Sequence, residues 1–261
     1  NLVSCVTPTN ARDGSAGETA PRASAVNLSR RSLVSTTFAV FGSGPLLSRE
    51  SAASTLSSTD YDAFADNYDV LNDAVGNDVL GFTELRAELL TRADGDVLEV
   101  GIGTGLNLPL YSAQKLDTLV GFDLSQGMLE KAAARSARMP FASQITLVQG
   151  DVAILPFEDG TFDHVVDTFS LCVFPDPAQA LAEMARVLRP SGTLLLVEHN
   201  QSPNPLLAAY QNMTAEVVAS VSKGCRYNQD VTRLVKEAGM RVISVKPALG
   251  GLITSIEAEL A

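Results

Sequence analysis

The chain has 261 residues and a formal net charge of −11 at pH 7. This acidic balance excludes a nucleic-acid substrate, because neutralising phosphates requires clustered Lys and Arg. It also disfavours charge-driven docking on anionic lipid. The sequence contains no apolar run of about 18 residues, so we predict no membrane-spanning helix.

The first 59 residues differ from the rest in composition. They are rich in Ser and Thr and hold five arginines against three acidic residues, which is typical of an organelle transit peptide. Arg30-Arg31 precede a mild apolar stretch that ends near residues 51–53, as in a twin-arginine export signal. We therefore predict a targeting leader over 1–59 and one globular domain over 60–261. A disordered tail is the alternative for the leader.

The destination of this leader is predicted from its composition alone. Its two parts resemble the leaders of plastid proteins bound for the thylakoid, and the mitochondrion is the alternative organelle.

The first half of the domain shows helical and strand patterns in turn. Apolar spacing predicts helices over 61–74 and 80–91, and Ser125 is the expected N-cap of a helix that ends near Ser136. Pro109 keeps any helix after the glycine-rich segment short. The expected strands are 96–100, 118–122, 145–148 and 164–168.

The second half continues the alternation. A helix over 177–188 is stopped by Pro190-Ser191-Gly192, and a strand over 193–197 follows. Two more helices are expected near 206–221 and 229–238, and two strands at 240–245 and 252–258. The last strand alternates apolar and polar residues, as an edge strand does. This order predicts an α/β fold with a doubly wound sheet and right-handed crossovers.

The most informative segment is 97–105, Val-Leu-Glu-Val-Gly-Ile-Gly-Thr-Gly, followed 18 residues after Gly105 by Asp123. An apolar strand that runs into such a turn brings its backbone against a nucleoside, and the later carboxylate holds the ribose. Leu106 stands where a dinucleotide fingerprint has its third glycine, which disfavours an NAD-dependent enzyme.

The chain resembles class I S-adenosylmethionine-dependent methyltransferases from about residue 61 to 258. The resemblance lies in five stretches in the family's order: 99–105, 121–125, 149–157, Phe162-Asp163 and 186–192. It implies a Rossmann-like sheet of seven strands in the order 3-2-1-4-5-7-6, with the seventh antiparallel. It implies S-adenosyl-L-methionine as cofactor.

The resemblance also implies a set of cofactor-binding residues. The glycine turn would face the methionine part, Asp123 would accept hydrogen bonds from the ribose hydroxyls, and Asp151 would bind the adenine amino group beside the Val152 backbone. The full set is Tyr68, Glu99, Gly101, Gly103, Gly105, Asp123, Leu124, Met128, Asp151 and Val152.

Several of these residues also have a purely structural interpretation. Asp123 is also suited to cap a strand, Asp151 to sit in a turn, and Glu99 to organise the loop by accepting backbone amides. Tyr68 belongs to a repeated Tyr-Asp pattern that resembles a cofactor lid, and its alternative is an ordinary helix packed on the sheet. As part of a lid, the Tyr68 ring would shield the sulfonium of the cofactor and offer it a cation–π contact.

Two candidates lie on the acceptor side. His199, after the strand over 193–197, has a near-neutral reference pKa that suits proton abstraction, and Asp167 ends the strand before it. Each has a structural alternative, as a strand-end contact or a buried carboxylate. His164 is expected to be structural. Cys172 is expected to pack, with a disulfide to Cys225 as the alternative, and no residues show metal-ligand spacing.

Two branches of the family fit best. The segments 202–205 and 224–226 resemble phosphatidylethanolamine N-methyltransferases, and 155–157 resembles quinone-biosynthesis C-methyltransferases. Both act on lipophilic small molecules. Residues 200–227 would form an insertion whose apolar side chains line the substrate pocket or pack inward: Leu206, Leu207, Ala208, Met213 and Val217.

The expected partner is therefore a small-molecule or lipid-like substrate, and peripheral association with a membrane is compatible with it. The competing hypothesis is a catalytically silent methyltransferase-like subunit of an organelle assembly. A silent subunit would be expected to lose the glycines or Asp123, and this chain keeps them.

Overall fold

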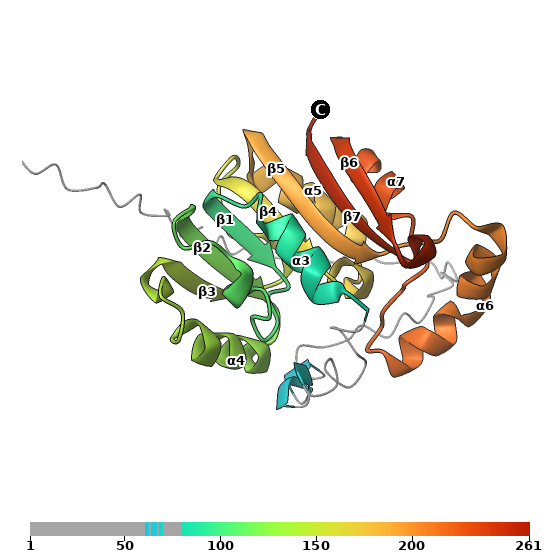
Figure 1. The fold of residues 1–261 in the computed structure, drawn as a ribbon, viewed down its shortest axis with the longest axis horizontal. Helices are drawn as coiled ribbons and strands as arrows, with labels where there is room; N and C mark the ends of the chain where they lie inside the picture. Colours follow the sequence, from blue (N-terminus) through green and yellow to red (C-terminus); the bar gives the residue numbers. More distant parts are fainter. Residues whose placement is uncertain (1–60, 63, 67, 70–79) are drawn as a thin grey trace, which may run out of the picture.

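The computed structural model describes residues 61–62, 64–66, 68–69 and 80–261. The predicted leader and much of the first predicted helix lie outside the described residues. The described part is a sheet with helices on both faces (Figure 1).

Seven strands form one sheet in the order β3-β2-β1-β4-β5-β7-β6. Strand β7 runs antiparallel to both of its neighbours, which confirms the predicted topology. The strands are β1 (Gly95–Val100), β2 (Leu116–Asp123), β3 (Ile145–Gln149), β4 (Phe162–Thr168), β5 (Leu188–His199), β6 (Met240–Ala248) and β7 (Ile253–Leu260).

Alternate residues of each central strand enter two separate cores. In β1, Leu98 joins the core under the helices that cover one face of the sheet, whereas Val97 joins the core under the helices of the other face. Both side chains are fully buried, as expected for a parallel strand covered on both faces. The helices are α3 (Phe82–Leu90), α4 (Gln126–Ser136), α5 (Pro177–Val187), α6 (Pro205–Val221) and α7 (Val231–Glu237).

Strand β5 begins five residues earlier than predicted. Helix α5 ends at Val187, before Pro190, and Pro190-Ser191-Gly192 does not delay the strand, because Leu188 already pairs with Phe162 of β4. The register between the two strands shifts after Phe162 and resumes at His164 with Thr193. The residues that read as a break therefore form an irregularity inside the strand, a position that suits Pro and Gly.

The alternation of the last strand, which resembled that of an edge strand, does not mark an edge, in agreement with the predicted strand order. Strand β7 lies between β5 and β6, and β6 forms the edge. Its alternation has another cause: Ile256 and Ala258 are buried in one core, whereas Ser255 and Glu257 point to the more open face.

Helix α6 projects beyond the sheet at the end of β5 (Figure 1). Of the five apolar side chains expected to line the substrate pocket or pack inward, four are exposed, including Leu207, and Ala208 is half-buried. Leu206, Met213 and Val217 are all exposed. Within the described residues, no helix is long and apolar enough to cross a membrane.

Candidate functional site

The turn after β1 is built from glycines in the left-handed region. Gly101, Gly103 and Gly105 have φ angles of 59°, 55° and 80°, which L side chains rarely adopt. A Cβ at Gly101 would lie 2.3 Å from Ser170 Oγ, and one at Gly105 would lie 2.7 Å from Leu108 Cδ1. These two glycines are therefore required by the protein's own packing.

Gly103 differs from the other two. A Cβ there would meet no atom closer than the Gly101 carbonyl oxygen at 3.9 Å, so this position faces open space. Packing does not require a glycine here, whereas a ligand lying against the turn would.

Asp123, at the end of β2, lies beside this opening. Its Oδ2 accepts the Gly103 backbone N–H at 2.8 Å, and its Oδ1 accepts the Ser125 N–H at 2.9 Å. Each oxygen keeps a further lone pair for a hydroxyl group. Burial raises the pKa of Asp123, and these backbone hydrogen bonds oppose the rise. The carboxylate and the open glycine fit a ribose.

The described part of residues 61–69 contacts the start of α4 and the glycine turn through two carboxylates. Asp62 accepts hydrogen bonds from Ser125 Oγ at 2.6 Å and from the Gly127 N–H at 2.8 Å. Asp69 accepts from Thr104 Oγ1 at 2.6 Å and pairs with Arg135 at 2.6 Å. The repeated Tyr-Asp pattern predicted that this segment is functional on account of its tyrosines. In the structure, its aspartates also make contacts.

Tyr68 lies between these two aspartates in sequence, and its ring packs edge-on against Phe64 with centroids 5.6 Å apart. Its predicted role as a cofactor lid stays a prediction.

Glu99 is buried inside β1 and is held by side chains, not by the backbone amides of its alternative interpretation. Asn107 Nδ2 and the Tyr111 hydroxyl each donate a hydrogen bond to it at 2.9 Å. Burial raises the pKa of Glu99 to about 7, although these donors lower it. Glu99 therefore anchors the segment that follows the glycine turn.

The residues expected around the adenine end of the cofactor differ in their exposure to solvent. Asp151 caps the short 3₁₀ turn Val152–Ile154 by accepting the Ala153 N–H at 2.9 Å. This contact matches its alternative interpretation as a turn residue. Val152 and Met128 are buried, whereas Leu124 is exposed. Asp151 Oδ1 makes this bond, and binding of adenine by the remaining oxygen stays a prediction.

On the acceptor side, Asp167 is fully buried next to Glu198, a carboxyl group that the sequence reading did not select. Ser170 donates its hydroxyl to Asp167 Oδ1, and the Ser170 and Leu171 amides donate to Glu198 Oε1 at 2.8 and 3.1 Å. The other oxygens, Asp167 Oδ2 and Glu198 Oε2, have no further partner. Burial raises the pKa of both groups, and the negative charge of Asp167 raises that of Glu198 further.

Arg86 of α3 is a second residue that sequence reasoning missed, because it belongs to no motif. Its guanidinium is buried and lies 4.9 Å from the centroid of the Phe169 ring. Phe169 has a φ of 62°, a strained conformation for a residue with a side chain. The positive charge of Arg86 acts on the buried Glu99 and Glu198, and partly offsets their burial.

His199 ends β5 and lies edge-on to Phe169, with ring centroids 5.3 Å apart. The structure brings it next to two cysteines: Cys225 Sγ lies 4.0 Å from His199 Nδ1 and 3.2 Å from Cys172 Sγ. The neighbouring Cys172, and then His199, lower the pKa of Cys225 to about 5. Both thiols are free. His164 lies elsewhere, 3.4 Å from Asp94.

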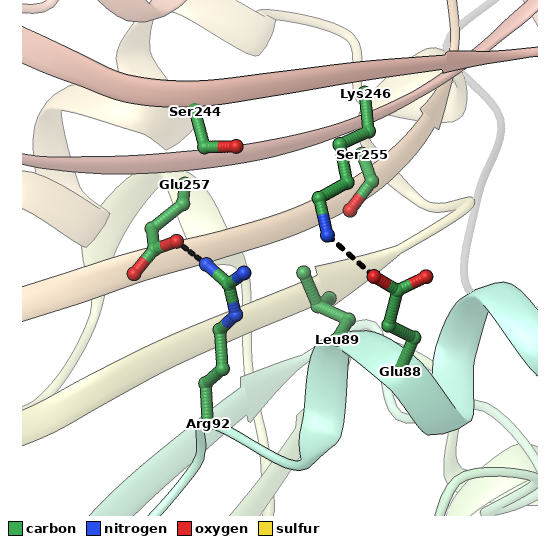
Figure 2. A pocket seen from close by; sticks show the side chains of 7 residues that line it. All are labelled: Glu88, Leu89, Arg92, Ser244, Lys246, Ser255 and Glu257. Atoms are coloured by element: carbon green, nitrogen blue, oxygen red, sulfur yellow. Dashed lines mark hydrogen bonds and ion pairs between the residues drawn. The ribbon is translucent and has the colours of Figure 1, made fainter.

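A separate pocket lies between α3 and strands β6 and β7, away from the glycine turn (Figure 2). Its four charged side chains pair across it, Arg92 with Glu257 and Lys246 with Glu88. These pairs satisfy the charges within the pocket, so it offers no argument for a ligand.

A doubly wound sheet with an open glycine turn beside a carboxylate at the end of the next strand is the architecture of nucleoside-binding α/β proteins. A family model described as "Methyltransferase domain" matches residues 98–196. The chain is 37% identical over 161 residues to a phosphatidylethanolamine N-methyltransferase of Cereibacter sphaeroides, spanning 61% of this chain and 77% of that protein. The chain belongs to the class I S-adenosylmethionine-dependent methyltransferases, and S-adenosylmethionine is its cofactor.

Two further comparisons agree. The ubiquinone/menaquinone biosynthesis C-methyltransferase UbiE of Roseobacter denitrificans is 30% identical over 182 residues, 68% of this chain and 73% of that protein. A solved Thermotoga maritima structure, described as a SAM-dependent methyltransferase and possible histamine N-methyltransferase, has a TM-score of 0.57 at 21% identity, covering 76% of this chain and 97% of that one. The relatives carry the names of enzymes, so the silent-subunit hypothesis gains no support.

Proposed function

We propose that this methyltransferase acts on a small lipophilic acceptor that it meets at a membrane surface. The observation that carries the proposal is the exposed apolar face of α6. Leu206, Met213 and Val217 are 83%, 76% and 67% exposed, and Tyr210 and Val221 continue the same stripe at intervals of three and four residues. Contiguous exposed apolar surface of this kind marks an interaction site.

The attachment of α6 supports this interpretation. Its one buried residue is the polar Gln211, which accepts the Ser202 N–H at 2.8 Å and donates to the carbonyls of Asn200 and Tyr227 at 3.0 Å each. These bonds tie the middle of α6 to the segment that follows β5. A helix that buries an amide and exposes its apolar residues is oriented toward an apolar environment outside the protein.

The names of two relatives point the same way. One is named for phosphatidylethanolamine and the other for ubiquinone and menaquinone, and these compounds are lipophilic. The transfer of this property to the present chain is our proposal. The net charge of −11 makes apolar insertion a better basis for contact than attraction to anionic lipid.

Residues for the reaction follow from the site. S-adenosylmethionine, when bound, supplies an electrophilic methyl group, and the protein supplies position and a dry pocket. We propose that Gly103 and Asp123 hold the nucleoside, with the other predicted cofactor residues around it. Asp167 and His199 remain our acceptor-side candidates. Because Asp167 is fully buried, we assign it a positioning role through Ser170 and Glu198.

The experiment is a methyl-transfer assay with methyl-labelled S-adenosylmethionine and a total lipid extract presented in vesicles. We expect label to enter the organic phase, and mass spectrometry then identifies the methylated lipid. Label that enters only water-soluble compounds would contradict the proposal. As a control, calorimetry with S-adenosylhomocysteine in parallel tests whether the same preparation binds this product of the cofactor.

We also propose an organellar location, with a plastid as the first expectation and the mitochondrion as the alternative. The support is the composition of residues 1–59. A fluorescent protein fused after residue 59 should accumulate in one of these organelles, and a diffuse signal throughout the cell would contradict the proposal.

A further inference from the structure

Three side chains from separate parts of the chain meet where β4 and β5 end. Cys172 lies in the 3₁₀ turn Leu171–Val173 after β4, His199 is the last residue of β5, and Cys225 lies between α6 and α7. One ligand atom from each, a sulfur or a ring nitrogen, lies within 4.8 Å of both others. Two thiols and an imidazole form a donor set that borderline and soft cations prefer.

We propose that Cys172, His199 and Cys225 bind a thiophilic cation of the Zn²⁺ class through two thiolates and one imidazole nitrogen. In a tetrahedral zinc site, bonds of about 2.3 Å to sulfur and about 2.0 Å to nitrogen separate the ligand atoms by roughly 3.5–3.8 Å. Here the two sulfurs lie 3.2 Å apart, and Cys225 Sγ lies 4.0 Å from His199 Nδ1. Shifts of about half an ångström bring these two pairs to zinc distances, and the third pair, Cys172 with His199, lies within 4.8 Å.

The backbone around the three ligands is already fixed. The Arg226 N–H donates to the Cys172 carbonyl at 2.8 Å, which joins the segment of Cys225 directly to the turn of Cys172. His199 pairs with Ile253 in the β5–β7 ladder. Both cysteines are buried. Binding therefore requires little ordering of the chain.

The charge of the occupied site is compatible with its surroundings. Each thiol gives its proton to solvent when the cation binds, and two thiolates then balance the two charges of Zn²⁺. A neutral site adds no net charge close to the buried Asp167 and Glu198, which already act on Cys172. An uncompensated ion there would be costly.

Within the part of the chain that the structure describes, no fourth His, Cys or carboxylate joins this cluster. Zinc sites with three protein ligands keep an open position for water or substrate. The cluster lies at the carboxyl ends of the parallel strands, where such sheets bind their ligands. The open position would therefore take water or a donor atom of the acceptor, and His199 Nδ1 would serve the cation instead of abstracting a proton.

The test uses the full chain, reduced with a non-thiol reductant and stripped with a chelator. Titration with Co²⁺ should give thiolate-to-metal charge-transfer absorption and the strong visible bands of a four-coordinate ion. It should saturate at one ion per chain, and Zn²⁺ should displace it. This measurement needs no mutation, so misfolding of a variant cannot obscure it.

The chain supplies its own matched controls, since it holds three cysteines and two histidines in all. Cys172→Ser, Cys225→Ser and His199→Gln should each weaken Zn²⁺ binding more than tenfold in a chelator competition. Cys5→Ser and His164→Gln should leave it unchanged. Calorimetry with S-adenosylhomocysteine on the same samples reports whether each variant is folded.

Three results would overturn the proposal. One is the lack of a charge-transfer band in the folded protein. Another is a band that persists in both cysteine variants, because the ion would then bind elsewhere. The third is a Cys172–Cys225 disulfide that survives the reductant, as shown by intact mass, because those sulfurs would then be unavailable. Each of these results leaves the lipid-methylation proposal to its own assay.

Discussion

The backbone N–H of Gly103 donates a hydrogen bond to Asp123 Oδ2 at 2.8 Å. This bond joins the turn after β1 to the end of β2, so the open glycine and the Asp123 carboxylate are held as one unit. The position of each residue therefore depends on the other, and their variants can be compared directly.

Asp123→Ala should weaken binding of S-adenosylhomocysteine by about tenfold or more. The change removes hydrogen bonds to an ionised acceptor, and each is worth about 1.5–3 kcal/mol. Isothermal titration calorimetry measures the dissociation constant. Asp117→Ala is the control, because Asp117 is exposed at the other end of the same strand. An unchanged constant in Asp123→Ala would reject the ribose role.

Gly103→Ala should separate stability from binding. A left-handed conformation costs an alanine about 1–2 kcal/mol, and the new Cβ enters the open space that we assign to the cofactor. Gly239→Ala is a matched control, since Gly239 has a φ of 80° and no atom within 4 Å of the built Cβ. In urea denaturation, we expect both variants to lose a similar amount of the free energy of unfolding. Only Gly103→Ala should lose S-adenosylhomocysteine binding, and equal binding by both variants would refute the assignment.

Glu99→Gln should change the pH dependence of stability. Between the ordinary pKa of 4.5 and the folded value of about 7, the folded state holds a proton that the unfolded state has lost. The free energy of unfolding therefore falls as pH rises through this window, by at most about 1.4 kcal/mol per unit.

Glutamine has no proton to lose, so Glu99→Gln should gain stability relative to the wild type between about pH 5 and about pH 8 in urea titrations. Glu84→Gln, on the exposed side of α3, controls for the loss of one negative charge. A constant difference between Glu99→Gln and the wild type across this range would show that burial does not raise the pKa of Glu99.

The paired change Met213→Ser and Val217→Ser should reduce binding to zwitterionic phosphatidylcholine vesicles several-fold, in co-sedimentation at high and low salt. These side chains lie in the exposed stripe of α6, so the melting temperature should change little. Ile243→Ser is the control, because Ile243 is an apolar residue of β6 that is 49% exposed. Equal sedimentation of both variants would contradict contact through α6.

The sheet was largely predictable because buried parallel strands carry a strong local signal. All seven strands were expected within a few residues, except that β5 starts earlier. The resemblance placed β7 correctly between β5 and β6, whereas its alternation suggested an edge. Ser255 and Glu257 alternate with apolar residues because one face is more open, and alternation reports an open face as readily as an edge. Only pairing with β5 distinguishes the two, and pairing is not visible along the chain.

The site was predictable where one local segment carries it. Gly103 belongs to a turn with its own sequence pattern, and Asp123 follows at a regular distance. Arg86 and Glu198 have no such pattern, because their importance comes from burial beside groups that are distant in sequence. The same is true of Cys172 and Cys225, which are separated by 53 positions and meet only when β4 and α6 are in place.

The interior place of β7 has a consequence for synthesis of the protein on the ribosome. Until residues 253–260 have left the exit tunnel, one side of β5 has no hydrogen-bonding neighbour. The nascent chain therefore presents an open strand to the chaperones and to other emerging chains. Protection of β5 against premature aggregation has to come from outside the fold until residues 253–260 pair with it.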